Sequence, residues 1–174
     1  IYINESFSTS HRNHASITGI SSFLPSFPGK LFEQEIKNLN VITKNLSQSR
    51  SVAILGGAKI STKVAIIDSL VKKFNKVLIG GAMANTFLAS QGIEIGKSFN
   101  EPKMQEQALT IIRKYRDKII LPEDAIVSNS ENPDDHRSVD IRKIKITDSI
   151  YDIGPKTRKS FFNEIIQCEK LLWN

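Results

Sequence analysis

Residues 51–63 read Ser-Val-Ala-Ile-Leu-Gly-Gly-Ala-Lys-Ile-Ser-Thr-Lys, an apolar run that ends in two glycines and is followed by two lysines four positions apart. This order predicts a buried strand at Val52–Leu55, a tight turn, and a helix at Ser61–Phe74 that carries the charge in its first turns. Glycines let a turn approach an oxyanion closely, and the N–H groups at a helix start favour negative charge. Taken alone, the stretch predicts equally well a phosphate-binding turn or a strand–helix corner with two solvated lysines.

A second copy of the pattern follows and favours the phosphate interpretation. Lys76–Ile79 is another short apolar run, it ends in Gly80 and Gly81, and a helical pattern covers Ala84–Gln91. Two neighbouring strands of this kind place two amide-rich turns at one edge of a parallel sheet, where doubly wound folds bind their ligands. Neither turn has the P-loop frame or the Gly-x-Gly-x-x-Gly frame of dinucleotide-binding proteins. We therefore expect a nucleotide-phosphate site of another type at this edge.

Strand and helix patterns alternate along the rest of the chain, which predicts a parallel α/β sheet. Ile1–Ile3 predicts a short strand, and Lys30–Leu46 predicts an amphipathic helix. Pro25, Pro28 and Gly29 predict an irregular connector between the two. The remaining predicted strands are Lys118–Leu121, Ala125–Val127 and Lys170–Trp173, and the remaining predicted helices are Lys103–Tyr115 and Lys156–Gln167.

Several blocks of residues, spread over the whole chain, stand in the order of one enzyme family. They are Asn4–Ser16, Gly56–Lys63, Ile79–Leu88, Leu121–Asp124, Asp152–Pro155 and Trp173–Asn174. The chain resembles phosphoglycerate kinases of bacterial type. This resemblance implies a Rossmann-like parallel three-layer α/β sandwich within an incomplete two-domain kinase. The implied parts are a remnant of the N-terminal phosphoglycerate-binding domain at residues 1–29, an interdomain helix at 30–46, and part of the C-terminal nucleotide-binding domain at 47–174.

The resemblance also implies a reaction and a set of ligands. The family transfers a phosphoryl group reversibly between 1,3-bisphosphoglycerate and ADP, with Mg²⁺, and gives 3-phosphoglycerate and ATP. Arg12 would contact the phosphoglycerate, His14 would order the same block and bind the same substrate, and Lys59 would hold the transferring phosphoryl group. Arg12 and Lys59 are thus the implied catalytic residues. The implied nucleotide site comprises Gly57, Ala58, Lys59, Lys63, Gly80, Gly81 and Asn174.

The family has further blocks that do not occur in this chain. Those that would precede Ile1 supply most of the phosphoglycerate site, and those that would follow Asn174 supply the metal carboxylate and one phosphate loop. We therefore expect this chain alone to be inactive and to lack a metal ligand. Within the chain, Glu5 replaces an aspartate of the family, Ala82 replaces a glycine, and Glu123 replaces an apolar residue. The Ala82 methyl group would crowd a backbone with positive φ, and Glu123 would bring charge near an anion site.

The chain carries 24 Lys and Arg residues against 18 Asp and Glu residues, and its formal net charge of +6 suits a protein that handles anions. The same excess would suit nucleic acid. However, the basic cluster has no interleaved aromatic residues and no recognition-helix pattern, so we expect a solvated surface and no nucleic-acid partner. His136 beside Asp134 and Asp135 allows a metal site, but a surface turn explains them better. The cluster comprises His136, Arg137, Arg142, Lys143 and Lys145.

The single cysteine, Cys168, and the lack of an apolar run of about 20 residues predict a cytoplasmic protein without a membrane partner. Three functions remain open: a piece of the kinase, a non-catalytic nucleotide-binding remnant, and a basic protein that binds nucleic acid or another acidic partner. The resemblance implies that whole members of the family are usually monomeric. We expect this chain by itself to self-associate, because a parallel sheet without its further strands exposes an edge.

Overall fold

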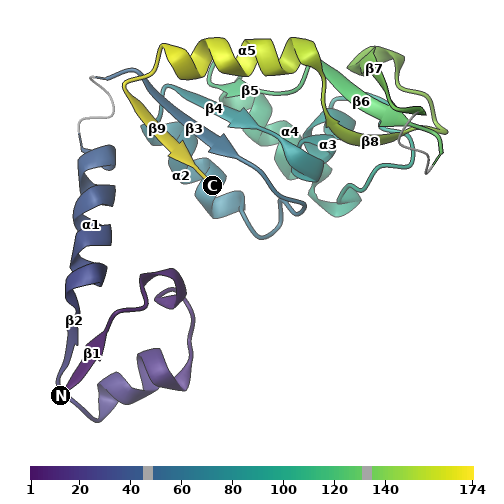
Figure 1. Cartoon of the computed structure of the whole chain (residues 1–174). Coiled ribbons are helices and arrows are strands. Elements are labelled where there is room, and N and C mark those ends of the chain that lie inside the picture. The colour runs from purple at the N-terminus through teal and green to yellow at the C-terminus, as the bar shows by residue number, and fades with distance from the viewer. Residues whose placement is uncertain (45–48, 131–134) are drawn as a thin grey trace. The chain divides into compact units, whose positions relative to one another are not determined.

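The computed structural model describes residues 1–44, 49–130 and 135–174, and for residues 42 and 43 the backbone alone. The chain divides into two compact units, Ile1–Lys44 and Asn45–Asn174. Figure 1 shows the elements of each unit along the chain.

The Ile1–Lys44 unit consists of a two-stranded parallel pair, short single-turn helices and one longer helix. Strand β2 occupies part of the stretch for which an irregular connector is predicted. It forms because its partner β1 lies beside it, with Tyr2 opposite Ser26, and because an edge strand tolerates the proline at its end. The elements are β1 (Tyr2–Asn4), the turns η1 (Phe7–Thr9), η2 (Ala15–Gly19) and η3 (Ile20–Ser22), β2 (Ser26–Pro28) and α1 (Lys30–Thr43).

Helix α1 begins at Lys30, as predicted, and ends at Thr43, whereas residues 45 and 46 of the predicted helix lie outside the described residues. The Glu5 carboxylate caps its first turn by accepting hydrogen bonds from the N–H groups of Leu31 at 3.0 Å and Phe32 at 3.2 Å. A side chain at Gly29 would place its Cβ 2.1 Å from the Glu5 carboxyl group. Glu5, which departs from the family pattern, therefore stabilises the start of α1.

The Asn45–Asn174 unit is organised around a four-stranded parallel sheet in the order β5-β4-β3-β9. Helix α5 covers one face of the sheet, and α2, α3 and α4 lie on the other, which gives three layers (Figure 1). This arrangement confirms the predicted parallel α/β sandwich. The strands are β3 (Ser51–Leu55), β4 (Lys76–Ile79), β5 (Ile119–Ile120) and β9 (Lys170–Trp173), and the helices are α2 (Val64–Lys73), α3 (Gly81–Ser90), α4 (Gln105–Lys114, after the turn η5 at Pro102–Met104) and α5 (Pro155–Ile166).

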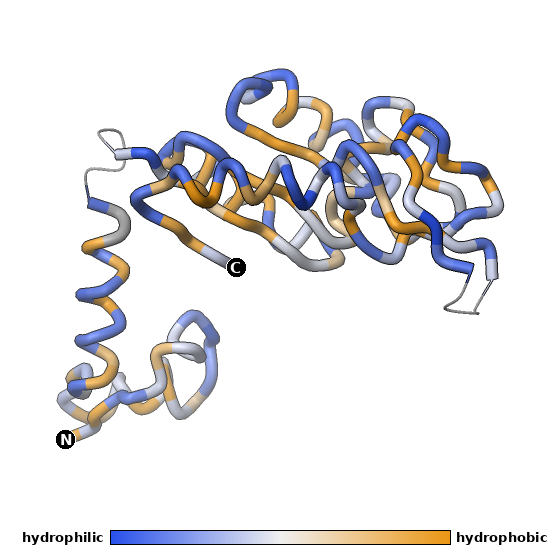
Figure 2. The backbone as a smooth tube through the Cα atoms, turned by 45° about the horizontal axis from the view of Figure 1, so that its top comes forward, coloured by the Kyte–Doolittle hydropathy of each residue, from blue (hydrophilic) through white to orange (hydrophobic). Residues whose placement is uncertain are grey.

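Strand alternation sends neighbouring residues of β3 and β4 to opposite faces, and both faces are covered. On the face covered by α5, Val52 and Leu78 pack with Phe161. Their neighbours Ala53 and Val77 are fully buried, which fits strands enclosed on both sides. Figure 2 shows the result as hydrophobic colour along the central strands, in contrast to the alternating colour of α1. The continuous apolar runs of the sequence are thus explained by double burial.

A second, three-stranded antiparallel sheet has the order β7-β6-β8, with a turn η7 (Ile141–Lys143) after β7. The sequence patterns place Ala125–Val127 in the parallel sheet, and this expectation is wrong. The strand pairs instead with two later strands, neither of which has an apolar run in the sequence. On one face of this sheet, Ala125 and Val127 pack against Ile144. The strands are β6 (Asp124–Ser128), β7 (Arg137–Asp140) and β8 (Ser149–Ile153).

Candidate functional site

Two glycine turns lie side by side at the carboxyl ends of β3 and β4. The strands are parallel neighbours, with Leu55 opposite Ile79, so both turns emerge at the same edge of the sheet. The Gly80 N–H donates to the Leu55 carbonyl at 2.9 Å, and the Met83 N–H donates to the Gly57 carbonyl at 2.9 Å. The first turn is therefore tied directly to the start of α3, and the two turns form one backbone surface.

Positive φ angles occur at the second glycine of each pair. Gly57 has φ of 125° and Gly81 has φ of 67°, in the range that favours glycine. A Cβ at Gly81 would lie 2.8 Å from the Gly57 carbonyl oxygen and 3.0 Å from its nitrogen, too close for two backbones to accept. The contact between the turns thus depends on the missing side chain at Gly81.

Ala82 does not carry the strain that its replacement of a glycine suggests. It lies within the α-helix that begins at Gly81, a backbone conformation that alanine adopts readily. The positive φ falls one residue earlier, at Gly81. The concern that the methyl group would crowd the turn is therefore answered by the geometry.

The helix predicted at Ser61–Phe74 begins three residues later, so the two lysines precede it and do not lie in its first turns. Helix α2 begins at Val64, Lys63 precedes it as the N-cap residue, and Lys59 lies in an irregular segment. Residues 61–63 form a turn before α2, in which the Ser61 N–H donates to the Glu101 carboxylate at 3.0 Å, while Ile60 is fully buried. Lys59 is exposed, so its ammonium group is free to meet solvent or a ligand.

Asn174 reaches the glycine turns through the pairing of β9 with β3. The Gly56 N–H donates to the Asn174 carbonyl at 2.9 Å, and the Asn174 N–H donates to the Ile54 carbonyl at 2.9 Å. The Lys63 ammonium group donates to the Asn174 side-chain oxygen Oδ1. The structure therefore brings Lys63 and Asn174 together beside the first glycine turn, although they are 111 positions apart.

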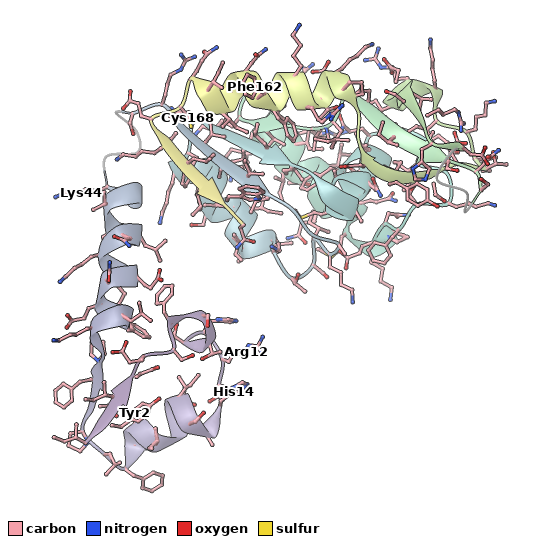
Figure 3. All side chains as sticks on the ribbon, in the orientation of Figure 1. Tyr2, Arg12, His14, Lys44, Phe162 and Cys168 are labelled. Atoms are coloured by element: carbon pink, nitrogen blue, oxygen red, sulfur yellow. The ribbon has the colours of Figure 1, made fainter. Side chains whose placement is uncertain are left out.

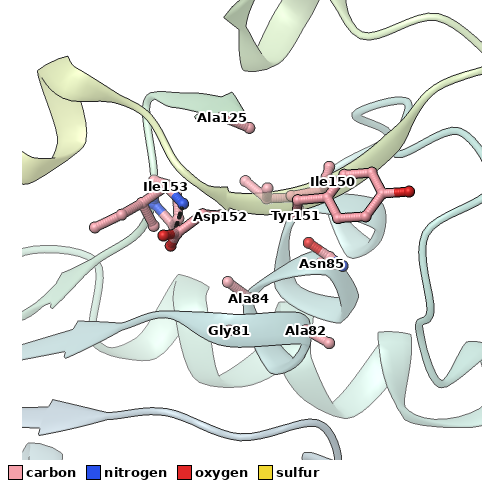
Figure 4. A pocket seen from close by; sticks show the side chains of 11 residues that line it. Gly81, Ala82, Ala84, Asn85, Ala125, Ile150, Tyr151, Asp152 and Ile153 are labelled. Carbon is pink, nitrogen blue, oxygen red and sulfur yellow. Dashed lines mark hydrogen bonds between the residues drawn. The ribbon is translucent and has the colours of Figure 1, made fainter. Parts of the chain in front are cut away.

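A pocket of about 130 Å³ opens beside the second turn, between α3 and β8. Figure 4 shows Ala82, Ala84 and Asn85 on one side and residues 150–153 on the other. Its lining is mostly apolar, with Asn85 and Asp152 as polar groups, and Asn85 is nearly fully buried. Of the residues that line this pocket, only Gly81 is among the predicted site residues. The block Asp152–Pro155 is the signal that could have pointed to it.

Asp124, the first residue of β6, holds the start of helix α5. Its carboxylate accepts hydrogen bonds from the N–H groups of Lys156 at 2.9 Å and Thr157 at 2.7 Å, and from the Thr157 hydroxyl at 2.6 Å. Burial raises the pKa of Asp124, but these hydrogen bonds outweigh it and hold the pKa below its ordinary value. Asp124 thus caps α5 as an ionised group, whereas its neighbour Glu123 is exposed.

Arg12 and His14 belong to the other unit, on the segment between η1 and η2 (Figure 3). Both residues are exposed. The Arg12 N–H donates to the Thr9 carbonyl at 2.9 Å, and the His14 carbonyl accepts from the N–H groups of Ile17 and Thr18 at 2.9 Å each. The backbone of His14 therefore orders this segment, while the Arg12 and His14 side chains remain accessible.

The basic cluster is partly neutralised within the fold. Arg137 donates to the fully buried Asp148 carboxylate at 2.6 Å, and the His136 ring stacks on Tyr151 with ring centres 4.6 Å apart. Asp134, the third member of the conceivable metal site, lies outside the described residues. Across residues 1–44, 49–130 and 135–174, no three His, Cys, Asp or Glu side chains are grouped so that they could hold a metal ion. In the same ranges, no helix is long and apolar enough to cross a membrane.

Comparisons with known proteins point to one family. The family model described as phosphoglycerate kinase matches residues 1–174. The phosphoglycerate kinases of Sinorhizobium fredii and Staphylococcus carnosus are 39% and 42% identical to all of this chain, and the chain covers 44% of each of them. The solved phosphoglycerate kinase of Coxiella burnetii superposes on 97% of the chain with a TM-score of 0.86 and 32% identity, and 44% of that protein is covered. The enzyme from Pyrococcus horikoshii, at 24% identity over 99% of the chain and 45% of its own, shares the fold with a TM-score of 0.83.

Proposed function

The chain belongs to the phosphoglycerate kinase family, and we propose that its Asn45–Asn174 unit binds an adenine nucleotide for the phosphoryl transfer of that family. The observation that carries the proposal is the interlock of the two glycine turns with Lys63 and Asn174 at one edge of the sheet. Such an edge offers backbone N–H groups and a cation to phosphate oxygens. The chain spans 44% of the length of the relatives named above.

The nucleotide fits the two parts of the site in one orientation. Its phosphates would lie along Gly57, Ala58 and Gly80, within reach of Lys63. Its base would enter the mostly apolar pocket that begins at Gly81, because such pockets with a few polar groups suit planar ligands. Asn174 would stand beside the nucleotide and hold Lys63 in place.

The proposed reaction joins 1,3-bisphosphoglycerate and ADP, and gives 3-phosphoglycerate and ATP. Lys59 is proposed to neutralise the transferring phosphoryl group, and Arg12 to bind the phosphoglycerate with the help of His14. Phosphoryl transfer spreads negative charge over the equatorial oxygens, so cations that meet this charge supply much of the catalysis. Each attacking group is already a carboxylate or phosphate oxygen, and no general base is needed.

We further propose that this chain acts only as part of a longer kinase. Residues 1–29 would belong to the phosphoglycerate-binding domain, 30–46 to the interdomain helix and 47–174 to the nucleotide-binding domain. Among the described residues, Arg12 and His14 would contribute to the phosphoglycerate side of the site. The nucleotide would arrive with Mg²⁺, but the described residues offer no cluster of carboxylates that fits the ion. A cytoplasmic location and a monomeric whole enzyme complete the proposal.

A second candidate is a nucleotide-binding remnant without catalysis. It is favoured by the contrast between the interlocked turns of one unit and the exposed Arg12 and His14 of the other. A nucleic-acid-binding role is less well supported, because Arg137 is engaged by Asp148. A shift of thermal unfolding on nucleotide binding supports both nucleotide-based candidates, and a turnover assay in the whole enzyme separates them.

The first test is a titration of the purified chain with Mg·ADP, followed by thermal unfolding. Saturation at about 100 times the dissociation constant stabilises a protein by roughly 2.7 kcal/mol, which moves the unfolding midpoint by several degrees. The double variant Lys59→Ala with Lys63→Ala should lose this shift. The double variant Lys73→Ala with Lys159→Ala removes the same charge from exposed positions on α2 and α5, and should keep it. A shift that the first variant keeps would refute the proposed site.

A further inference from the structure

The segment that carries the two lysines is held by a residue from a distant loop. Glu101 lies 40 positions after Ser61, and its carboxylate accepts two hydrogen bonds from that one residue. The Ser61 N–H donates to Oε2 at 3.0 Å and the Ser61 hydroxyl donates to Oε1 at 2.6 Å. Both carboxylate oxygens are thus engaged by the midpoint of the Lys59–Lys63 segment.

Glu101 is itself fixed on helix α3. Its N–H donates to the hydroxyl of Thr86 at 3.0 Å, and Thr86 is fully buried. Two residues earlier, the Phe99 carbonyl accepts from the side-chain nitrogen of Asn85 at 3.1 Å. Helix α3 begins at the second glycine turn. The hydrogen bonds to Asn85 and Thr86 therefore attach the loop that carries Glu101 to the same helix that begins at this turn.

The lysine segment needs such a support because it is not helical. Its internal hydrogen bonds include the Lys63 N–H to the Ile60 carbonyl at 2.8 Å and the Thr62 hydroxyl to the Lys59 carbonyl at 3.1 Å. Ser61 N–H would point into solvent without Glu101, and a carboxylate is a strong acceptor for it. The Glu101 carboxylate therefore ties this non-helical segment to the loop that precedes α4.

We propose that Glu101 is a positioning residue that holds Lys59 and Lys63 against the two glycine turns for nucleotide binding. The inference rests on the proposed nucleotide site and adds to it a residue that touches no ligand. It acts through Ser61, from the loop that precedes α4. Its hydrogen bonds from Ser61, with a smaller contribution from the charge of Lys59, hold the pKa of Glu101 below its ordinary value, so the carboxylate is ionised at neutral pH.

The sign of the effect distinguishes positioning from simple electrostatics. An anion beside a phosphate site repels the ligand and competes for Lys59, so its removal would tighten nucleotide binding if charge alone mattered. If Glu101 positions the lysines, its removal weakens binding in spite of the relieved repulsion. The two explanations therefore predict opposite changes in the dissociation constant.

The experiment measures the dissociation constant of Mg·ADP by calorimetry, well below the unfolding temperature, for the wild-type chain and Glu101→Ala. The expected result is roughly tenfold weaker binding in Glu101→Ala, a change equivalent to about 1.4 kcal/mol. Glu101→Gln keeps an oxygen for the Ser61 N–H and should fall between the two. Glu106→Ala removes an exposed charge from the first turn of α4 and should bind like the wild type. Unchanged or tighter binding in Glu101→Ala would overturn the proposal.

A second readout does not depend on the nucleotide. Hydrogen exchange of the Ser61 amide, followed by NMR, should be slow in the wild-type chain and much faster in Glu101→Ala, with the amides of β3 unaffected. If the wild-type chain does not bind Mg·ADP, the proposed nucleotide site fails, and this readout still tests the support. Equal protection of the Ser61 amide in both proteins would overturn it.

Discussion

Replacing Gly81 by alanine is expected to lower the free energy of unfolding of the Asn45–Asn174 unit by about 3 kcal/mol. Two effects add. The φ angle of 67° costs an alanine about 1–2 kcal/mol. The new Cβ would lie 2.8 Å from the Gly57 carbonyl oxygen, and moving that turn adds about 1–3 kcal/mol, as overpacking does. Alanine also reduces the conformational freedom of the unfolded chain, which offsets about 0.5 kcal/mol of this loss.

Urea unfolding monitored by circular dichroism measures this change. With a slope of about 2 kcal/mol per molar urea, the midpoint should fall by roughly 1.5 M. The neighbouring residue supplies the control. Gly80 has an extended backbone, and a Cβ there would meet nothing within 4 Å, so Gly80→Ala should cost less than about 1 kcal/mol. Equal midpoints for the two variants would refute the claim that the interlock of the turns depends on Gly81.

Three further outcomes are expected. Asp124→Asn should lower the free energy of unfolding by about 2 kcal/mol at neutral pH. Because folding lowers the pKa of Asp124, the stabilisation that its carboxylate provides is lost as the pH falls through the folded-state pKa. The urea midpoints of the wild type and the variant should therefore converge in acid, and midpoints that stay equally far apart at every pH would contradict this. Arg137→Ala, which strips an ion-pair partner from the fully buried Asp148, should cost about 1–3 kcal/mol by the same assay, and an unchanged midpoint would show that the pair contributes nothing. Sedimentation should show self-association of the wild-type chain that Trp173→Lys reduces, because Trp173 is 79% exposed on the edge strand β9; a monodisperse wild-type monomer would oppose it.

Local pattern was enough for the parts of the fold that are buried on both faces. The apolar runs at β3 and β4 could be found because every residue in such a strand favours an apolar side chain. Strands β7 and β8 could not be found, because one face of each is polar and their pairing with β6 depends on contacts far apart in the sequence. The same holds for the buried pair of Arg137 and Asp148, which reads as surface charge in a linear sequence.

The candidate site also has parts that the local sequence predicts and parts that depend on contacts between distant residues. Paired glycines after two strands indicate where the turns lie, but only the backbone shows that the second glycine of each pair has the positive φ. The predicted helix at Ser61–Phe74 begins three residues later, at Val64, and the bond from the Ser61 N–H to Glu101, 40 residues away, could not be predicted from the local pattern. The pocket beside α3 could not be predicted either, because residues of β8 line it and no apolar run in the sequence indicates that strand.

The position of β9 has a consequence for the order in which the chain is made. Strand β3 lies between β4, which follows it closely in sequence, and β9, whose residues 170–173 are synthesised more than a hundred residues later. During translation, β3, α2 and β4 can therefore assemble while one side of β3 still faces water. Lys63 gains its Asn174 partner only when residue 174 has left the ribosome, so the nascent chain has two glycine turns before it has a finished site.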